Sequence, residues 1–218
     1  LSTGDEIVSV GTAPLPPGCV RDVNGAAVSA LLSKYGFPAE YRGIVKDDAE
    51  EFEKRVKSEL ADCDVLILSG GSSVGVRDNC SRVLEALPAP GLLIRGINIV
   101  PGKPTLIAGC AEEKKLVVSL PGHPLSCVSA AFTVLIPLLL KMSSHDAVFP
   151  KHSISLELAY DLNAKTGPEE FTPCDGKVYP ISAKSGYVSA LSSSDGLVRI
   201  PEDMETVRKG EHVEVWLW

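Results

Sequence analysis

A short apolar run with a glycine-rich loop directly behind it limits the possible folds of this chain more than any other part of the sequence. Residues 65–68 read Val-Leu-Ile-Leu, and Ser69, Gly70 and Gly71 follow at once. A continuous apolar run of this length is typical of a strand buried on both faces of a parallel sheet. Ligands of such sheets bind beyond the carboxyl ends of the strands. The run therefore predicts a layered α/β domain with a binding site at that edge.

Helical and strand patterns alternate through the first two thirds of the chain. Residues 24–35 and 48–60 carry apolar side chains at helical spacing, which predicts two helices, the second capped by Asp47 or Asp48. Further strands are predicted at residues 39–45, 92–100, 105–108 and 116–119, and a closing helix at residues 124–142. Alternating elements with short connections predict a layered α/β domain over residues 1–146.

The pattern of secondary-structure signals in the sequence changes after Pro150. Short segments at residues 153–158, 177–181, 196–200 and 212–217 are separated by Gly, Pro, Asn and Asp. No helical period survives there, so residues 147–218 are predicted to form a small all-β domain, a barrel or a sandwich. A length of 218 residues agrees with one large domain and a smaller companion.

Composition narrows the class of protein. The chain is 44% hydrophobic and 22% charged, which is typical of a globular protein. Its net charge of −7 disfavours sequence-independent binding to the phosphates of nucleic acid. Six cysteines without a C-x-x-C pair indicate free thiols in a reducing cytoplasm. Residues 124–140 carry no charge, but they are shorter than a membrane span and contain Pro137, so a buried helix is predicted and no membrane partner.

Four loops combine the residue types that bind anions. They are Ser2-Thr3-Gly4-Asp5-Glu6, Ser69-Gly70-Gly71-Ser72-Ser73-Val74-Gly75 with Asp78 behind it, Pro101-Gly102-Lys103-Pro104, and Leu120-Pro121-Gly122-His123-Pro124-Leu125-Ser126. Glycines let backbone N–H groups approach a ligand, and a lysine in a rigid turn offers a point charge to an oxyanion. Each loop alone can also be an ordinary polar turn. All four are expected at strand ends of the α/β domain.

The second loop has another interpretation. Gly71-Ser72-Ser73-Val74-Gly75 matches G-x-S-x-G, the nucleophile elbow of serine hydrolases, with Ser73 as nucleophile and His123 as the best-placed base. That elbow needs a helix directly after the serine. Because Arg77-Asp78-Asn79 is expected to delay the helix, a hydrolase is the less favoured hypothesis.

The carboxylates of the loops suggest a cation. An acidic protein that binds a phosphate must avoid repulsion between the ligand and groups such as Asp47 and Asp78. A bridging Mg²⁺ removes this repulsion by taking one or two carboxylates together with phosphate oxygens. The sequence therefore predicts a metal-assisted anion site.

Taken as a set, in this order and spacing, the four loops resemble the molybdopterin-binding domain of the MoeA and gephyrin E-domain family. Residues 167–171, 194–198 and 209–211 resemble the family's C-terminal β domain, so the resemblance covers the whole chain. It implies a three-layer α/β domain with a mostly parallel sheet, followed by a small barrel-like β domain. It also implies insertion of molybdate, or of tungstate, into adenylated molybdopterin with release of AMP and with Mg²⁺ as cofactor.

By the same resemblance, Asp47, Asp78 and Lys103 are expected to be catalytic, and Glu6 and Asp78 to hold the metal. The residues expected to bind the substrate are Ser2, Thr3, Gly4, Asp5, Ser69, Gly70, Gly71, Ser73, Gly75, Pro121, Gly122, Pro124 and Ser126.

The sequence also departs from the family. Val100 stands where family members carry a second lysine, His123 replaces an asparagine, Arg21 a tyrosine and Ser72 a valine. These changes keep open a second hypothesis, a non-catalytic molybdopterin-binding or scaffold module. Family members also have two further domains before the first loop. We therefore expect these residues to be part of a longer cytoplasmic enzyme that forms a homodimer, and to be inactive alone.

Overall fold

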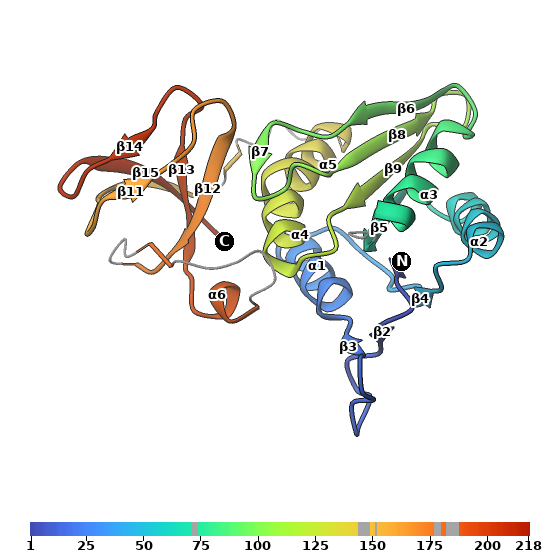
Figure 1. The fold of residues 1–218 in the computed structure, drawn as a ribbon. Coiled ribbons are helices and arrows are strands. Elements are labelled where there is room, and N and C mark those ends of the chain that lie inside the picture. The colour runs from blue at the N-terminus through green and yellow to red at the C-terminus, as the bar shows by residue number, and fades with distance from the viewer. Residues whose placement is uncertain (71–73, 144–148, 151, 177–179, 182–187) are drawn as a thin grey trace. The chain divides into compact units, whose positions relative to one another are not determined.

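The structure is a computed structural model of residues 1–218, and it describes all of them except residues 71–73, 144–148, 151, 177–179 and 182–187 (Figure 1). For residues 74–78 it describes the backbone alone. The chain divides into two compact units. The first unit comprises Leu1–Ile97 and Pro104–His123, and the second comprises Asn98–Lys103 and Pro124–Trp218. Each unit is described by itself.

A six-stranded sheet forms the centre of the first unit. Its order is β4 (Ile44–Val45), β1 (Ser2–Thr3), β5 (Val65–Gly70), β9 (Lys115–Leu120), β8 (Leu106–Cys110) and β6 (Pro90–Arg95). The first four strands are parallel to one another, and the last two are antiparallel to their neighbours. The predicted buried strand, β5, therefore lies inside the parallel part of the sheet, and the expectation of a mostly parallel sheet is confirmed.

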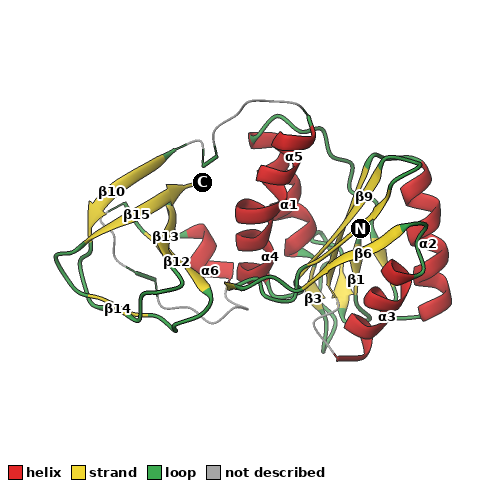
Figure 2. Ribbon diagram, turned by 90° about the horizontal axis from the view of Figure 1, so that it is seen from above, coloured by secondary structure: helices red, strands yellow, loops and turns green. Residues whose placement is uncertain are grey.

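Helices cover both faces of this sheet. The helices α2 (Ala49–Ala61) and α3 (Val74–Glu85) lie on one face and α1 (Val23–Lys34) on the other (Figure 2). Phe52, Val56 and Leu60 are buried in a core cluster together with residues of β5, β8 and β9. The predicted three-layer arrangement is confirmed.

Short polar side chains begin two of these helices. The carboxylate of Asp22 accepts a hydrogen bond from the N–H of Gly25, and that of Asp48 accepts from the N–H groups of Glu50 and Glu51. Of the two capping candidates for α2, Asp48 is therefore the cap, which leaves Asp47 available for other contacts.

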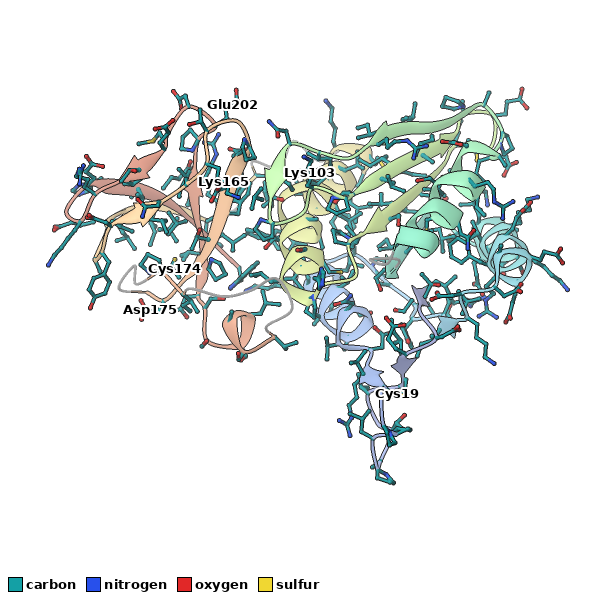
Figure 3. All side chains as sticks on the ribbon, viewed as in Figure 1. Cys19, Lys103, Lys165, Cys174, Asp175 and Glu202 are labelled. Atoms are coloured by element: carbon teal, nitrogen blue, oxygen red, sulfur yellow. The ribbon has the colours of Figure 1, made fainter. Side chains whose placement is uncertain are left out.

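A narrow excursion extends from the first unit between β2 (Ile7–Val8) and β3 (Val20–Arg21), which pair in parallel (Figure 1). Arg21 bridges it by donating a hydrogen bond to the carbonyl of Thr12 at 2.9 Å. Cys19 lies on this excursion (Figure 3).

The second unit is built on a five-stranded sheet. Its order is β10 (Ser153–Glu157), β15 (His212–Leu217), β13 (Gly196–Ile200), β12 (Glu169–Cys174) and β7 (Ile99–Val100), and β11 (Leu162–Asn163) pairs separately with β14 (Thr206–Val207). β7 is parallel to β12, and the other strands of the sheet are antiparallel to their neighbours. Leu158, Val198 and Val215 are among the residues that form its core.

The uncharged segment of residues 124–140 is helical, as predicted. It runs as α4 (Pro124–Ala130), a π-helical turn (Ala131–Leu135) and α5 (Ile136–Met142). Pro137 has no N–H to donate, so the wider turn before it relieves the interrupted hydrogen-bond ladder. By length and composition alone the helix could cross a membrane, but 61% of its most apolar window is buried within the protein. This burial is typical of a core helix.

Three expectations from the sequence are wrong in detail. The strand predicted at residues 92–100 is two strands, β6 and β7, which belong to different units. The strand predicted at residues 39–45 is reduced to the two residues of β4. The C-terminal region is not entirely β, because a short helix, α6 (Val188–Ser192), interrupts it. The predicted boundary near residue 146 lies outside the described residues and stays a prediction.

Candidate functional site

The carboxyl ends of four parallel strands bring three of the predicted loops side by side. Thr3, the last residue of β1, pairs in register with Val45 on one side and with Gly70 on the other. Ser69 in turn pairs with Leu120, the last residue of β9. The loops that begin at Gly4, at residue 71 and at Pro121 therefore leave the sheet from one edge. This edge, at the carboxyl ends of the strands, is where ligands of parallel sheets bind.

Two side-chain hydrogen bonds lie along this edge, one between two hydroxyls and one between a hydroxyl and a carboxylate. The hydroxyls of Ser2 and Ser69 are 3.0 Å apart, and the hydroxyl of Thr3 donates a hydrogen bond to Oδ1 of Asp47 at 3.1 Å. Ser2, Thr3 and Ser69 are all buried. Since buried polar groups are costly without partners, these bonds fix the ends of β1 and β5 relative to each other and to Asp47.

Carboxylates gather beside the hydroxyls. The backbone N–H of Asp47 donates a hydrogen bond to Oδ1 of Asp5 at 3.2 Å. Partial burial raises the pKa of the Asp47 carboxyl, and the neighbouring charges of Asp5 and Glu6 also raise it. The hydrogen bonds that this carboxyl accepts from the Thr3 hydroxyl and from the Asp5 backbone N–H act in the opposite direction. A carboxylate held near like charges and partly removed from water favours a nearby cation.

Gly70 lets β5 approach β1 closely at this point. Its φ angle is +126°, and a Cβ atom built on it would lie 2.1 Å from the carbonyl oxygen of Thr3. Only glycine fits there, because an added Cβ would collide with backbone that cannot rotate away. Gly70, the last residue of β5, therefore determines how closely the two strands approach at the start of the glycine loop.

Two residues that were not predicted as site residues also support this edge. Asn24 donates a hydrogen bond from Nδ2 to the carbonyl of Gly122 at 2.8 Å, which ties the start of α1 to the loop after β9. Its Oδ1 is buried and has no partner among the described residues. Tyr41 donates a hydrogen bond to Oδ2 of Asp22 at 2.5 Å. The available sequence signal was a polar residue in the first turn of a helix, as Asn24 is.

The remaining predicted residues divide between the second unit and the undescribed part of the chain. Lys103, Pro124 and Ser126 belong to the second unit, where Lys103 is exposed on the turn after β7 (Figure 3) and Ser126 is buried in α4. The expectation that this lysine loop follows a strand of the α/β sheet is therefore wrong.

The glycine loop itself is described only in part. Gly71 and Ser73 lie outside the described residues, while Gly75 and Asp78 are located only as backbone positions of α3. The helix begins at Val74, so the expectation that residues 77–79 delay it is wrong, and that particular objection to a nucleophile elbow at Ser73 does not hold. Among the described side chains, no group of three or more His, Cys, Asp and Glu residues is arranged to hold a metal ion by itself.

Comparison with known proteins identifies the class of this fold and site. Residues 1–141 match the family described as a probable molybdopterin binding domain, and residues 156–218 match the MoeA C-terminal region, domain IV. The chain therefore belongs to the MoeA family of molybdopterin biosynthesis proteins and comprises its molybdopterin-binding domain and its C-terminal domain.

Individual relatives agree with this assignment. A molybdopterin biosynthesis protein of Methanocaldococcus jannaschii is 30% identical over the whole of this chain and 54% of its own length. The molybdopterin molybdenumtransferase of a Nostoc species is 28% identical over 98% of this chain and 51% of its own length. The crystal structure of a MoeA protein from Pyrococcus horikoshii superposes with a TM-score of 0.85 at 32% identity, over 99% of this chain and 52% of that one. The chain thus spans about half the length of these relatives.

Proposed function

We propose that this chain is the molybdopterin-binding part of a molybdopterin molybdenumtransferase, which inserts molybdate, or tungstate, into adenylated molybdopterin and releases AMP. The observation that carries the proposal is the gathering of Ser2, Thr3, Asp47 and Ser69 at one sheet edge, in a chain of the MoeA family. Relatives named molybdopterin molybdenumtransferase support the reaction.

In this proposal the edge of the sheet holds the phosphate end of the substrate. The residues proposed to bind the substrate are Ser2, Thr3, Gly4, Asp5, Ser69, Gly70, Gly71, Ser73, Gly75, Pro121 and Gly122 of the first unit, with Pro124 and Ser126 of the second unit as further binding residues. Asp47 and Asp78 act at the reacting phosphate, and Lys103 offers its ammonium to an anion. Charge-assisted hydrogen bonds of this kind are about twice as strong as neutral ones, which suits a doubly charged oxyanion.

A divalent cation, Mg²⁺, belongs to the same proposal. The described residues fit it, because the Asp47 carboxyl is held beside the negative charges of Asp5 and Glu6. Mg²⁺ usually takes only one or two carboxylates and completes its shell with substrate phosphate and water. Glu6 and Asp78 would hold it, and when bound it would supply the positive charge between carboxylates and phosphate.

The test uses the complete protein that contains this chain. We expect Asp47→Asn to lower the rate of AMP release from adenylated molybdopterin with molybdate at least about a hundredfold without loss of the fold. The matched control is Asp62→Asn, an exposed carboxylate at the end of α2, for which we expect an unchanged rate. An unchanged rate in Asp47→Asn would refute the assignment of the site.

Calorimetry separates the enzyme from the scaffold hypothesis. An enzyme of this kind should bind adenylated molybdopterin with a heat that depends on Mg²⁺, whereas a scaffold module should show no such dependence. The complete protein is further proposed to be a cytoplasmic homodimer, which light scattering of the purified protein would test.

A further inference from the structure

The turn that carries Lys103 directly follows β7, an edge strand of the sheet of the second unit. In β7, Ile99 pairs with Glu169 and Val100 with Glu170, both in register with the parallel strand β12. The carbonyl of Asn98 accepts a hydrogen bond from the N–H of Glu169 at 3.0 Å. The segment before the lysine is thus held by strand pairing, although its pairing partner lies far along the chain.

The side chain of Asn98 adds a second tie to the same strand. Its Nδ2 donates a hydrogen bond to the carbonyl of Gly167 at 2.5 Å, just before β12 begins. Gly167 is itself fixed, because its N–H donates to the carbonyl of Glu202 at 2.9 Å. The start of β7 is therefore anchored at two neighbouring positions of the C-terminal domain.

The turn after β7 packs onto the same unit. Ile99 is buried. A Cβ atom built on Gly102 would lie 2.7 Å from Cδ1 of Ile99 and 3.3 Å from the Cβ of Ala130 in α4. The φ angle of Gly102 is +135°, a conformation that side chains other than glycine rarely adopt. The backbone of the turn is thus closely packed, while the side chain of Lys103 remains exposed.

The strand that receives β7 is braced from its other side. Arg199 in β13 donates a hydrogen bond to the carboxylate of Glu169, and it also donates to that of Glu214 in β15 at 3.1 Å. Its guanidinium lies over the ring of Trp216, 5.6 Å from the ring centre. Two further strands of this sheet, β13 and β15, therefore hold β12, the strand to which the lysine turn is tied.

We propose that the C-terminal β domain sets the position of the Lys103 ammonium, with Asn98 and Ile99 as positioning residues. This inference rests on the proposed function, in which Lys103 binds an anion. A lysine is a point charge on a flexible stem, so the location of its Cα limits where the charge can act. The role given to the β domain is to fix that location by holding the backbone that leads into Gly102.

The first experiment measures the tie without reference to function. Hydrogen exchange of the amides of residues 99, 100, 102 and 103 is compared in the complete protein, in Asn98→Ala and in the control Asn163→Ala. Asn163 is an exposed asparagine of the same domain, and its side chain also makes one hydrogen bond, accepting from Thr206 at 3.3 Å. We expect about tenfold faster exchange in Asn98→Ala only. Equal exchange in the two variants would overturn the positioning role of Asn98.

The second experiment is a double-mutant cycle with inorganic molybdate as the probe. We expect Lys103→Ala to weaken molybdate binding about tenfold and Asn98→Ala about threefold. If Asn98 acts through Lys103, its effect disappears when Lys103 is already alanine. Ile99→Ala should behave in the same way, whereas Val207→Ala, which removes a buried side chain of the same domain elsewhere, should show no such coupling to Lys103.

The outcomes separate the two proposals. Additive losses in the cycle, or coupling equally strong for Val207→Ala, would overturn the positioning role. If Lys103→Ala leaves molybdate binding unchanged, the assigned function of the lysine fails, and the exchange measurement still decides whether Asn98 holds the turn.

Discussion

Replacing Gly70 with alanine tests the close approach of β5 to β1 at the edge of the site. The methyl group would lie 2.1 Å from the carbonyl oxygen of Thr3 and 2.9 Å from its Cγ2, at a φ angle of +126°. Backbone strain at such a φ costs about 1 to 3 kcal/mol. A clash with backbone adds about 1 to 3 kcal/mol, because the two strands must separate. We therefore expect a total loss of about 2 to 6 kcal/mol in the free energy of unfolding.

Two other glycines divide this loss into its parts. Gly36 has a φ angle of +81° with no atom within 4 Å of the added methyl, so Gly36→Ala should show the backbone strain alone, about 1 to 2 kcal/mol. Gly11 has open space and no positive φ angle, so Gly11→Ala should change stability by no more than about 0.5 kcal/mol.

Urea unfolding followed by circular dichroism measures all three variants. The expected order of destabilisation is Gly70→Ala, then Gly36→Ala, then Gly11→Ala. If Gly70→Ala costs no more than Gly36→Ala, the carbonyl of Thr3 does not constrain this position and the described contact between β1 and β5 is wrong.

Three further predictions concern single side chains. The folded state raises the pKa of the Asp47 carboxyl, so the protein loses stability when this carboxyl ionises at a pH above that pKa. Asp47→Asn, which cannot ionise, should therefore be more stable than the native protein at pH 7. Urea titrations should show this advantage vanishing below about pH 4, where the carboxyl is protonated in both the folded and the unfolded state. Burial raises the pKa of Cys80 to about 11 and that of Cys174 to about 12, so a thiol reagent at pH 8 should modify these two slowly, and Cys19→Ser should remove a faster phase. Tyr41→Phe should cost about 1 to 2 kcal/mol in thermal unfolding, because the buried Asp22 carboxylate loses a donor; an unchanged midpoint would contradict this bond.

Long elements with clear periodicity were predictable from the sequence. The spacing of Phe52, Val56 and Leu60 predicts the buried face of α2, and all three are buried in the structure. The apolar run before Ser69 likewise predicts β5. In both cases the local pattern alone determines which side chains meet the core, so no knowledge of distant residues is needed.

The shortest strands were not predictable in this way. β1 and β4 have two residues each, too few to show any period, and both are held by pairing in the parallel sheet. The hydroxyl pair of Ser2 and Ser69 joins residues 67 positions apart. The sequence places both residues at strand ends, but only the register of the sheet brings them within hydrogen-bonding distance.

The Lys103 turn shows why neighbours in sequence can be poor guides to neighbours in space. Apolar residues predominate from position 92 to 100, which predicts one strand of the α/β sheet. Gly96 interrupts it with a φ angle of +83°, and its N–H donates to the carbonyl of Thr105 at 2.9 Å. This bond joins the two segments of the first unit on either side of residues 98–103, which belong to the second unit, where β7 pairs with β12. The partner of the lysine turn is therefore found by asking where the displaced backbone completes its hydrogen bonds, a question that the local pattern does not answer.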